Sequence, residues 1–144
     1  NENTMWNKAI RPADMKKEIS NEEQKSAKII SEKLDYIGTM CVEYFRDQDD
    51  TLLVNEVAPR VHNSGHLTIN AFNISQFENH IRAVCGLKSE KVKKFFNAEM
   101  INILGRDIEK YKGKSFNDPK FFFDYGKKVI KDKRKMGHLT ILKK

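Results

Sequence analysis

Residues 37–57 read IGTMCVEYFRDQDDTLLVNEV and carry the clearest structural pattern in the chain. Two runs, Ile37 to Arg46 and Thr51 to Val57, are rich in the β-branched and aromatic residues that favour strands. Between them lies the polar segment Asp47-Gln48-Asp49-Asp50, which is typical of a four-residue hairpin loop. The stretch therefore predicts a β-hairpin.

Each predicted strand contains one glutamate, Glu43 in the first and Glu56 in the second. A charge inside an otherwise apolar strand needs a reason, because burying it unpaired is costly. If the loop places Arg46 opposite Thr51, the glutamates become diagonal neighbours on one face, roughly 7–8 Å apart. From there they can converge on a hard cation such as Mg²⁺. A solvated face, or a lysine partner for each glutamate, explains the pattern equally and stays open.

Helices are expected before and after the hairpin. A capping box formed by Ser20 and Glu23 predicts the start of an amphipathic helix over about residues 21–35. A second capping pattern at residues 75–78, SQFE, predicts a helix that ends at Gly86.

Strands dominate the expectation for the rest of the chain. After a lysine-rich connector, apolar runs predict strands at residues 98–104, 121–125 and 138–142. The fold class expected is α+β, with helices on an antiparallel sheet. We expect one domain over residues 1–90 and a small β-rich domain over residues 91–144.

Composition narrows the partners without choosing one. The 144 residues have a formal net charge of +7, which favours nucleic acid, acidic membranes or phosphorylated small molecules as partners. No apolar run approaches the roughly 18–20 residues of a membrane span, which excludes membrane insertion. No membrane is expected among the partners. The two cysteines, Cys41 and Cys85, have no CxxC partner and no histidine at metal-ligand spacing. We expect buried free thiols and a cytoplasmic location.

Residues 55–66 form the most distinctive motif, NEVAPRVHNSGH. It resembles the signature NE-[IV]-APR-x-HNSGH of the carboxyaminoimidazole ribonucleotide synthases, a family of ATP-grasp ligases. Three later segments, SQFE at 75–78, RAVCGL at 82–87 and RKMGH at 134–138, resemble later landmarks of the family in the same order. The resemblance covers nearly the whole chain and is weakest over residues 88–120. It implies the C-terminal half of an ATP-grasp fold followed by a small β-rich appendage.

The resemblance also implies a reaction. Enzymes of this family use ATP and bicarbonate to carboxylate 5-aminoimidazole ribonucleotide in purine biosynthesis, through a carboxyphosphate intermediate. The implied cofactor is Mg²⁺, with Mn²⁺ as a possible substitute, and the implied intact enzyme is a homodimer that also has N-terminal and lid domains.

The motif assigns roles to the residues around the hairpin. Glu43 and Glu56 would be the metal ligands. Asn55, with Glu56, would lie beside the nucleotide phosphates, although the hairpin register assumed above points Asn55 to the opposite face. Arg60 would face the transferring phosphoryl group as the catalytic residue, a role that suits a planar and permanently charged guanidinium.

Substrate contacts are implied in two further places. His62, Asn63 and Ser64 would contact the ribonucleotide or the intermediate from the loop. Lys127 and Arg134 would hold the 5′-phosphate of the ribonucleotide. Taken singly, each of these side chains is more typical of a solvated loop.

Two other functions compete with this interpretation. Formate-dependent glycinamide ribonucleotide transformylase, also an ATP-grasp enzyme, has a loop similar to EVSPRPHDTG, but residues 63–66 read NSGH and favour the carboxylating family. A basic nucleic-acid-binding module could use residues 127–135 with nearby aromatic side chains. It leaves the glutamates in the strands unexplained, so no nucleic-acid partner is expected.

The 144 residues contain no glycine-rich phosphate loop and no Walker A pattern. The sequence is therefore expected to be a piece of a larger enzyme, with the metal ligands and part of the substrate site but without a complete nucleotide pocket.

We therefore predict that the 144-residue chain alone does not hydrolyse ATP. Its sequence lacks the glycine-rich lid and the lid lysines that would hold the nucleotide phosphates. ADP release measured with and without 5-aminoimidazole ribonucleotide tests it. Robust ribonucleotide-dependent ADP release from the chain by itself would contradict the prediction.

Overall fold

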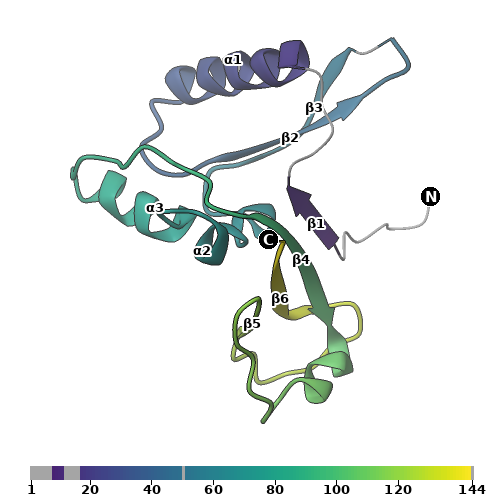
Figure 1. Ribbon diagram of the computed structural model, residues 1–144. Helices are drawn as coiled ribbons and strands as arrows, with labels where there is room; N and C mark the ends of the chain where they lie inside the picture. Colours follow the sequence, from purple (N-terminus) through teal and green to yellow (C-terminus); the bar gives the residue numbers. More distant parts are fainter. Residues whose placement is uncertain (1–7, 12–16, 50, 144) are drawn as a thin grey trace. The chain divides into compact units, whose positions relative to one another are not determined.

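The computed structural model describes residues 8–11, 17–49 and 51–143 (Figure 1). The chain divides into two compact units, each built from separate segments. The hairpin unit comprises residues 13–66 and 74–92, and the sheet unit comprises residues 1–12, 67–73 and 93–144. The expected domain boundary near residue 90 stays a prediction.

The hairpin unit contains the predicted pair of antiparallel strands, β2 (Cys41–Arg46) and β3 (Leu52–Ala58). The carboxylate of Asp47 organises the turn between them, because its Oδ1 accepts hydrogen bonds from the backbone N–H groups of Asp49 and Thr51, each at 2.9 Å. The local sequence signal for the hairpin is thus confirmed.

The register of the hairpin differs from the expected one. Arg46 lies opposite Leu52, and the register shifts between Tyr44, which faces Val54, and Glu43, which faces Glu56. Asn55 is the extra residue, so β3 has a bulge at this point. The glutamates are therefore direct cross-strand partners, and the predicted diagonal arrangement is wrong.

Helix α1 (Lys17–Lys33) precedes the hairpin and was predicted with the wrong start. Ser20 lies within the helix, so it is not the N-cap. Good helix formers such as Lys17 and Glu18 extend the helix upstream of the capping pattern. The hydroxyl of Tyr44 on β2 donates a hydrogen bond of 3.0 Å to the carbonyl of Glu23, which ties the helix to the hairpin.

Helix α3 (Gln76–Val84) confirms the second capping prediction. The Oγ of Ser75 accepts a hydrogen bond from the N–H of Glu78 at 3.1 Å. At the other end Gly86 has a φ of +68°, the left-handed conformation that commonly ends a helix. Cys85 lies at the C-cap, beyond the last helical residue, and is exposed, so the expectation of a buried thiol is wrong there.

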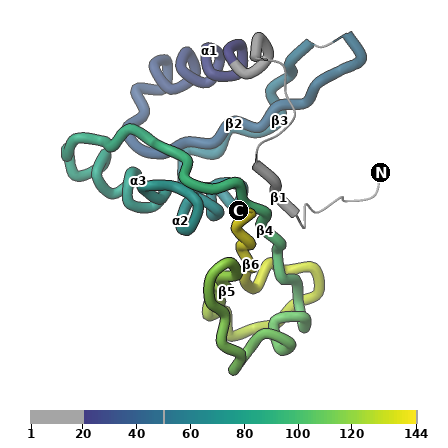
Figure 2. Tube along the Cα trace, in the orientation of Figure 1, coloured from purple at the N-terminus to yellow at the C-terminus, as the bar shows by residue number. Residues whose placement is uncertain are grey.

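The sheet unit is a four-stranded antiparallel sheet with the order β1-β4-β6-β5. Its strands confirm the predicted runs and add an edge strand from the start of the chain. They are β1 (Lys8–Arg11), β4 (Asn97–Leu104), β5 (Lys120–Asp124) and β6 (Lys135–Lys143). The tube in Figure 2 follows the chain through β4, β5 and β6 from green to yellow.

Two hydrophobic clusters hold the sheet unit together. In one, Ala71 from the short helix α2 (Thr68–Ala71) packs with Met100 of β4 and Leu142 of β6. In the other, Ile108 from the 3₁₀ helix η2 (Gly105–Lys110) packs with Met136 of β6. The central strands β4 and β6 therefore supply most of the buried side chains.

Gly137 is required where β5 meets β6. A Cβ at this position would collide with the carbonyl oxygen of Phe123 on the neighbouring strand, so a larger residue would push the strands apart. Among the described helices, none combines the length and apolar character needed to cross a membrane. Helices with antiparallel sheets make the fold class α+β, as predicted.

Candidate active site

The two glutamates of the hairpin define the candidate site. Glu43 and Glu56 occupy directly opposite positions on β2 and β3, where cross-strand Cβ atoms are typically about 4.5–5.5 Å apart. Like charges in such positions destabilise a hairpin, so the arrangement needs positive charge or hydrogen-bond donors nearby. Their side chains are 32% and 49% exposed, which leaves both carboxylates accessible from solvent.

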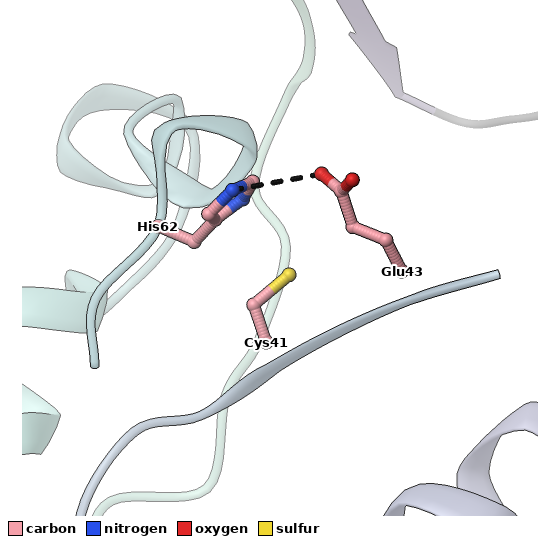
Figure 3. A group of neighbouring side chains, drawn as sticks. All are labelled: Cys41, Glu43 and His62. Atoms are coloured by element: carbon pink, nitrogen blue, oxygen red, sulfur yellow. Dashed lines mark ion pairs between the residues drawn. The ribbon is translucent and has the colours of Figure 1, made fainter. Parts of the chain in front are cut away.

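Three neighbouring side chains, those of His62, Arg60 and Asn55, supply that compensation. The imidazole Nε2 of His62 lies 3.5 Å from Oε1 of Glu43, the pair joined by the dashed line in Figure 3. The guanidinium of Arg60, four residues further along the chain, lies 3.8 Å from Oε1 of Glu56. This second pair is exposed and contributes at most about 1 kcal/mol. Neither glutamate has a lysine partner among the ion pairs of the described residues.

The bulge brings Asn55 to the carboxylate of Glu43. The side-chain amide of Asn55 donates a hydrogen bond of 3.4 Å to Oε2 of Glu43. In a regular strand Asn55 and Glu56 would point to opposite faces, since side chains alternate. The extra residue removes that alternation locally. The sequence-based placement of Asn55 on the opposite face is therefore wrong, for the same reason as the register.

The side chain of Gln76 on α3 holds the loop after β3. Its Oε1 accepts a hydrogen bond from the backbone N–H of His62 at 2.9 Å, and its Nε2 donates to the carbonyl of His62 at 2.7 Å. Nε2 also lies 2.7 Å from Nδ1 of His66. Gln76 thus pairs with both backbone groups of His62, much as a neighbouring strand would. The sequence motif SQFE contained this residue, but only as part of a helix start.

Within the loop, His62 is oriented by Ser64. The hydroxyl of Ser64 lies 3.0 Å from Nδ1 of His62, and the backbone N–H of Ser64 points at the same nitrogen from 3.4 Å. Asn63 and Ser64 belong to the 3₁₀ turn η1 (Asn63–Gly65). The imidazole is 16% exposed, so its Nε2 is presented to Glu43 in a nearly closed environment.

Cys41 also belongs to this neighbourhood. Its Sγ lies 3.9 Å from the hydroxyl of Ser64, and the ligand atoms of Cys41, Glu43 and His62 all lie within 4.8 Å of one another (Figure 3). Sequence spacing showed no histidine near Cys41, because the loop that brings His62 back is a tertiary feature.

The other predicted substrate residues, Lys127 and Arg134, lie in the sheet unit. Nζ of Lys127 donates a hydrogen bond of 2.6 Å to the carbonyl of Lys135 and lies 5.3 Å from the ring centre of Tyr125. Burial lowers the pKa of Lys127, and the positive charges of Arg134 and Lys135 lower it further. The side chain of Arg134 donates to the carbonyl of Val129 at 3.1 Å. The positive charges of Lys127 and Arg134 therefore repel each other.

The geometry around the hairpin fits a hard divalent cation. Two opposed carboxylates offer oxygen ligands, and Mg²⁺ is commonly held by one or two carboxylates together with phosphate oxygens. A cation between Glu43 and Glu56 would also relieve the repulsion of their charges. Arg60 and Asn55 lie next to these ligands, where they can contact an anionic group bound to the metal.

Family models match both parts of the chain. Residues 1–77 match the ATP-grasp domain, and residues 98–144 match the phosphoribosylaminoimidazole carboxylase C-terminal domain. The first match covers more than half of the chain. The chain therefore belongs to the ATP-grasp family, as the motif in residues 55–66 predicted.

Within this family the chain is similar to N5-carboxyaminoimidazole ribonucleotide synthases. It is 40% identical over 143 residues to the synthase of Staphylococcus epidermidis, which covers 98% of this chain and 38% of the relative. The crystal structure of the Staphylococcus aureus synthetase complexed with ADP matches with a TM-score of 0.87 and 38% identity, over 99% of this chain and 39% of that one.

A fungal structure shows the same likeness. The synthase of Aspergillus clavatus, in complex with ADP and 5-aminoimidazole ribonucleotide, matches with a TM-score of 0.87 and 28% identity, over 99% of this chain and 40% of that one. The chain thus spans about two fifths of the length of the relatives that it matches.

Because Gln76 makes two hydrogen bonds to the backbone of His62, we expect Gln76→Ala to loosen the loop around His62. The substitution leaves the N–H and the carbonyl of His62 without these partners, which should cost about 1–3 kcal/mol of local stability. Amide hydrogen exchange at His62 should then be faster by about tenfold or more. Gln48→Ala, an exposed change in the hairpin turn, is the matched control. Unchanged exchange at His62 in Gln76→Ala would show that the loop is held in another way.

Proposed function

We propose that this chain supplies the metal ligands and part of the substrate site of an ATP-dependent ligase that carboxylates 5-aminoimidazole ribonucleotide with bicarbonate. The product would be N5-carboxyaminoimidazole ribonucleotide, an intermediate of purine biosynthesis. The observation that carries the proposal is the directly opposed pair Glu43 and Glu56 at the start of the loop NEVAPRVHNSGH. The names of the similar synthases support the choice of substrate.

Glu43 and Glu56 would hold Mg²⁺, or Mn²⁺ in its place, and the ion would neutralise negative charge on the phosphates of ATP. The amide of Asn55 contacts the carboxylate of Glu43 and would orient it toward the nucleotide side of the ion. Glu56 therefore has two roles, as a metal ligand and as a neighbour of the nucleotide phosphates.

Arg60 is the residue that we propose for stabilising the transferring phosphoryl group. Its guanidinium is folded back onto Glu56 at 3.8 Å, a weak and exposed contact that can be exchanged for a stronger one. An anionic group bound beside the metal would offer charge-assisted hydrogen bonds. His62, Asn63 and Ser64 would contact the ribonucleotide or the carboxyphosphate from the loop that Gln76 holds in place.

Lys127 and Arg134 would bind the 5′-phosphate of the ribonucleotide. The lowered pKa of Lys127 indicates that its charge is held in an unfavourable place, partly because Arg134 is close. A bound phosphate dianion would reverse this effect, since its charge favours the protonated amine. Two cations that repel each other in the free protein are suited to bind one anion together.

Several further features belong to the same proposal. The complete enzyme would include other ATP-grasp domains with lysines for the nucleotide phosphates, and it would be a homodimer. We propose a cytoplasmic location, and the two free thiols, one of them exposed, support a reducing compartment.

If Glu56 is a metal ligand, Glu56→Gln in the complete enzyme should remove most of the Mg²⁺-dependent turnover. The substitution deletes one ligand charge without changing the volume of the side chain. Glu78→Gln, the same chemical change on the exposed start of α3, should leave turnover near the wild-type rate. Initial rates of ADP release across a Mg²⁺ titration make the comparison. A Glu56→Gln rate within about threefold of wild type, under roughly 1 kcal/mol in the barrier, would exclude the ligand role.

If Arg134 binds the 5′-phosphate, Arg134→Ala should raise KM for the ribonucleotide far more than KM for ATP. Losing a guanidinium–phosphate contact should cost roughly 1.5–3 kcal/mol, which is about a ten- to hundredfold rise. Arg106→Ala, at an exposed arginine of η2, is the control. Equal effects on both substrates would contradict the assignment. Weakened nucleic-acid binding with intact catalysis would favour the basic-module alternative.

A further inference from the structure

Three side chains of types that bind metals, Cys41, Glu43 and His62, form a cluster that shares Glu43 with the glutamate pair. Cys41 and Glu43 are two residues apart on β2, so their side chains lie on the same face of the hairpin. The loop after β3 places His62 against that face, with Nε2 3.5 Å from Oε1 of Glu43. Figure 3 shows the thiol, the carboxylate and the imidazole directed toward one region, and their ligand atoms lie within 4.8 Å of one another.

The chemistry of this set differs from that of the magnesium site. Mg²⁺ prefers oxygen ligands and gains little from a thiolate or an imidazole. Zn²⁺ binds cysteine, histidine and carboxylate ligands in tetrahedral geometry, at roughly 2.0–2.3 Å from each atom. Those bond lengths place a sulfur and a nitrogen ligand about 3.6 Å apart. In the chain, Nε2 of His62 and Oε1 of Glu43 are 3.5 Å apart, and all three ligand atoms lie within 4.8 Å of one another, so side-chain rotations would complete the site.

The surroundings of His62 suit a metal ligand. Metal-binding histidines usually donate their other ring N–H to a nearby oxygen, which fixes the orientation of the ring. The hydroxyl of Ser64 lies 3.0 Å from Nδ1 of His62, while the backbone N–H of Ser64 donates to the same nitrogen at 3.4 Å. Metal binding at Nε2 requires the tautomer with its hydrogen on Nδ1, in which the hydroxyl of Ser64 accepts the hydrogen bond and the backbone contact is given up. The backbone of His62 is also held on both sides by Gln76. Two of the three ligands are therefore on a paired strand, and the third is on a braced loop.

We propose that Cys41, Glu43 and His62 bind Zn²⁺ or a similar thiophilic divalent cation, with a fourth coordination position open to solvent or to a ligand. Glu43 is common to this site and to the proposed magnesium site, so one ion excludes the other from that carboxylate. Zinc would thus act as a competitive inhibitor toward magnesium. The competition rests on the proposed function, whereas zinc binding by the three side chains does not.

Cobalt substitution of the 144-residue chain tests the site directly. Co²⁺ bound through a thiolate produces a sulfur-to-metal charge-transfer band in the near ultraviolet, and added Zn²⁺ should displace it. Cys41→Ser should abolish the band and weaken Zn²⁺ binding by at least about tenfold. Losing a side chain that only hydrogen-bonds to a metal ligand already costs about 10- to 100-fold in affinity, and Cys41 would be a ligand itself. Cys85→Ser, which changes the other and exposed thiol, should keep both the band and the affinity.

Further variants identify the remaining ligands. His62→Ala and Glu43→Gln should each weaken Zn²⁺ binding, measured by competition with a chromophoric chelator, while far-ultraviolet circular dichroism verifies that each variant is folded. Absence of the charge-transfer band in the folded wild-type chain, or its persistence in Cys41→Ser, would overturn the proposal. In the complete wild-type enzyme, Zn²⁺ should inhibit turnover, and excess Mg²⁺ should relieve the inhibition. In Cys41→Ser this inhibition should disappear. Both results together would support the proposal that the two ions share the carboxylate of Glu43. If cobalt and zinc bind as expected but Mg²⁺ does not compete, the zinc site stands and the magnesium role of Glu43 is excluded.

Discussion

The repulsion between Glu43 and Glu56 is the constraint around which the hairpin unit is organised. Two carboxylates placed directly across a pair of strands oppose the pairing that brings them together. The imidazole of His62, the amide of Asn55 and the guanidinium of Arg60 partly offset that repulsion. Asn55 is the bulge residue, and the other two lie in the loop that follows β3. None of these contacts is short or strong. The negative charge of the two carboxylates is therefore only weakly compensated by the side chains around them.

The fold could be predicted where the signal was local. The hairpin strands, the N-cap at Ser75 and the strand that ends before Gly105 depend on residue preferences within a few positions, and the structure confirms them. The bulge at Asn55 could not be predicted, because a single extra residue changes the register without changing the apolar pattern. Ser20 misled the assignment of α1 because a capping pattern is also compatible with a helix interior.

The candidate site shows a similar division. The motif from Asn55 to His66 identified the region and Glu56, and the strand pattern identified Glu43, while the roles of the individual side chains stay predictions. Gln76 and Cys41 were not recognised as part of the site, since their importance depends on a loop that returns to a strand and a helix distant in sequence. Lys127 and Arg134 were named from the family landmarks, but the sequence did not show that burial and the charge of Arg134 lower the pKa of Lys127, because both effects depend on the folded loop.

The order of strands in the sheet unit has a consequence for how the chain folds. Strands β5 and β6 pair across a short stretch of sequence, with Phe123 opposite His138, whereas β1 pairs Lys8 with Ile101 across most of the chain. Closing a long loop costs more entropy before its contacts form, and such non-local pairings slow folding. The sheet should therefore grow from β5 and β6 through β4 and receive β1 last. Until β1 arrives, the edge of β4 presents unpaired backbone groups, which is the period of greatest exposure to association with other chains.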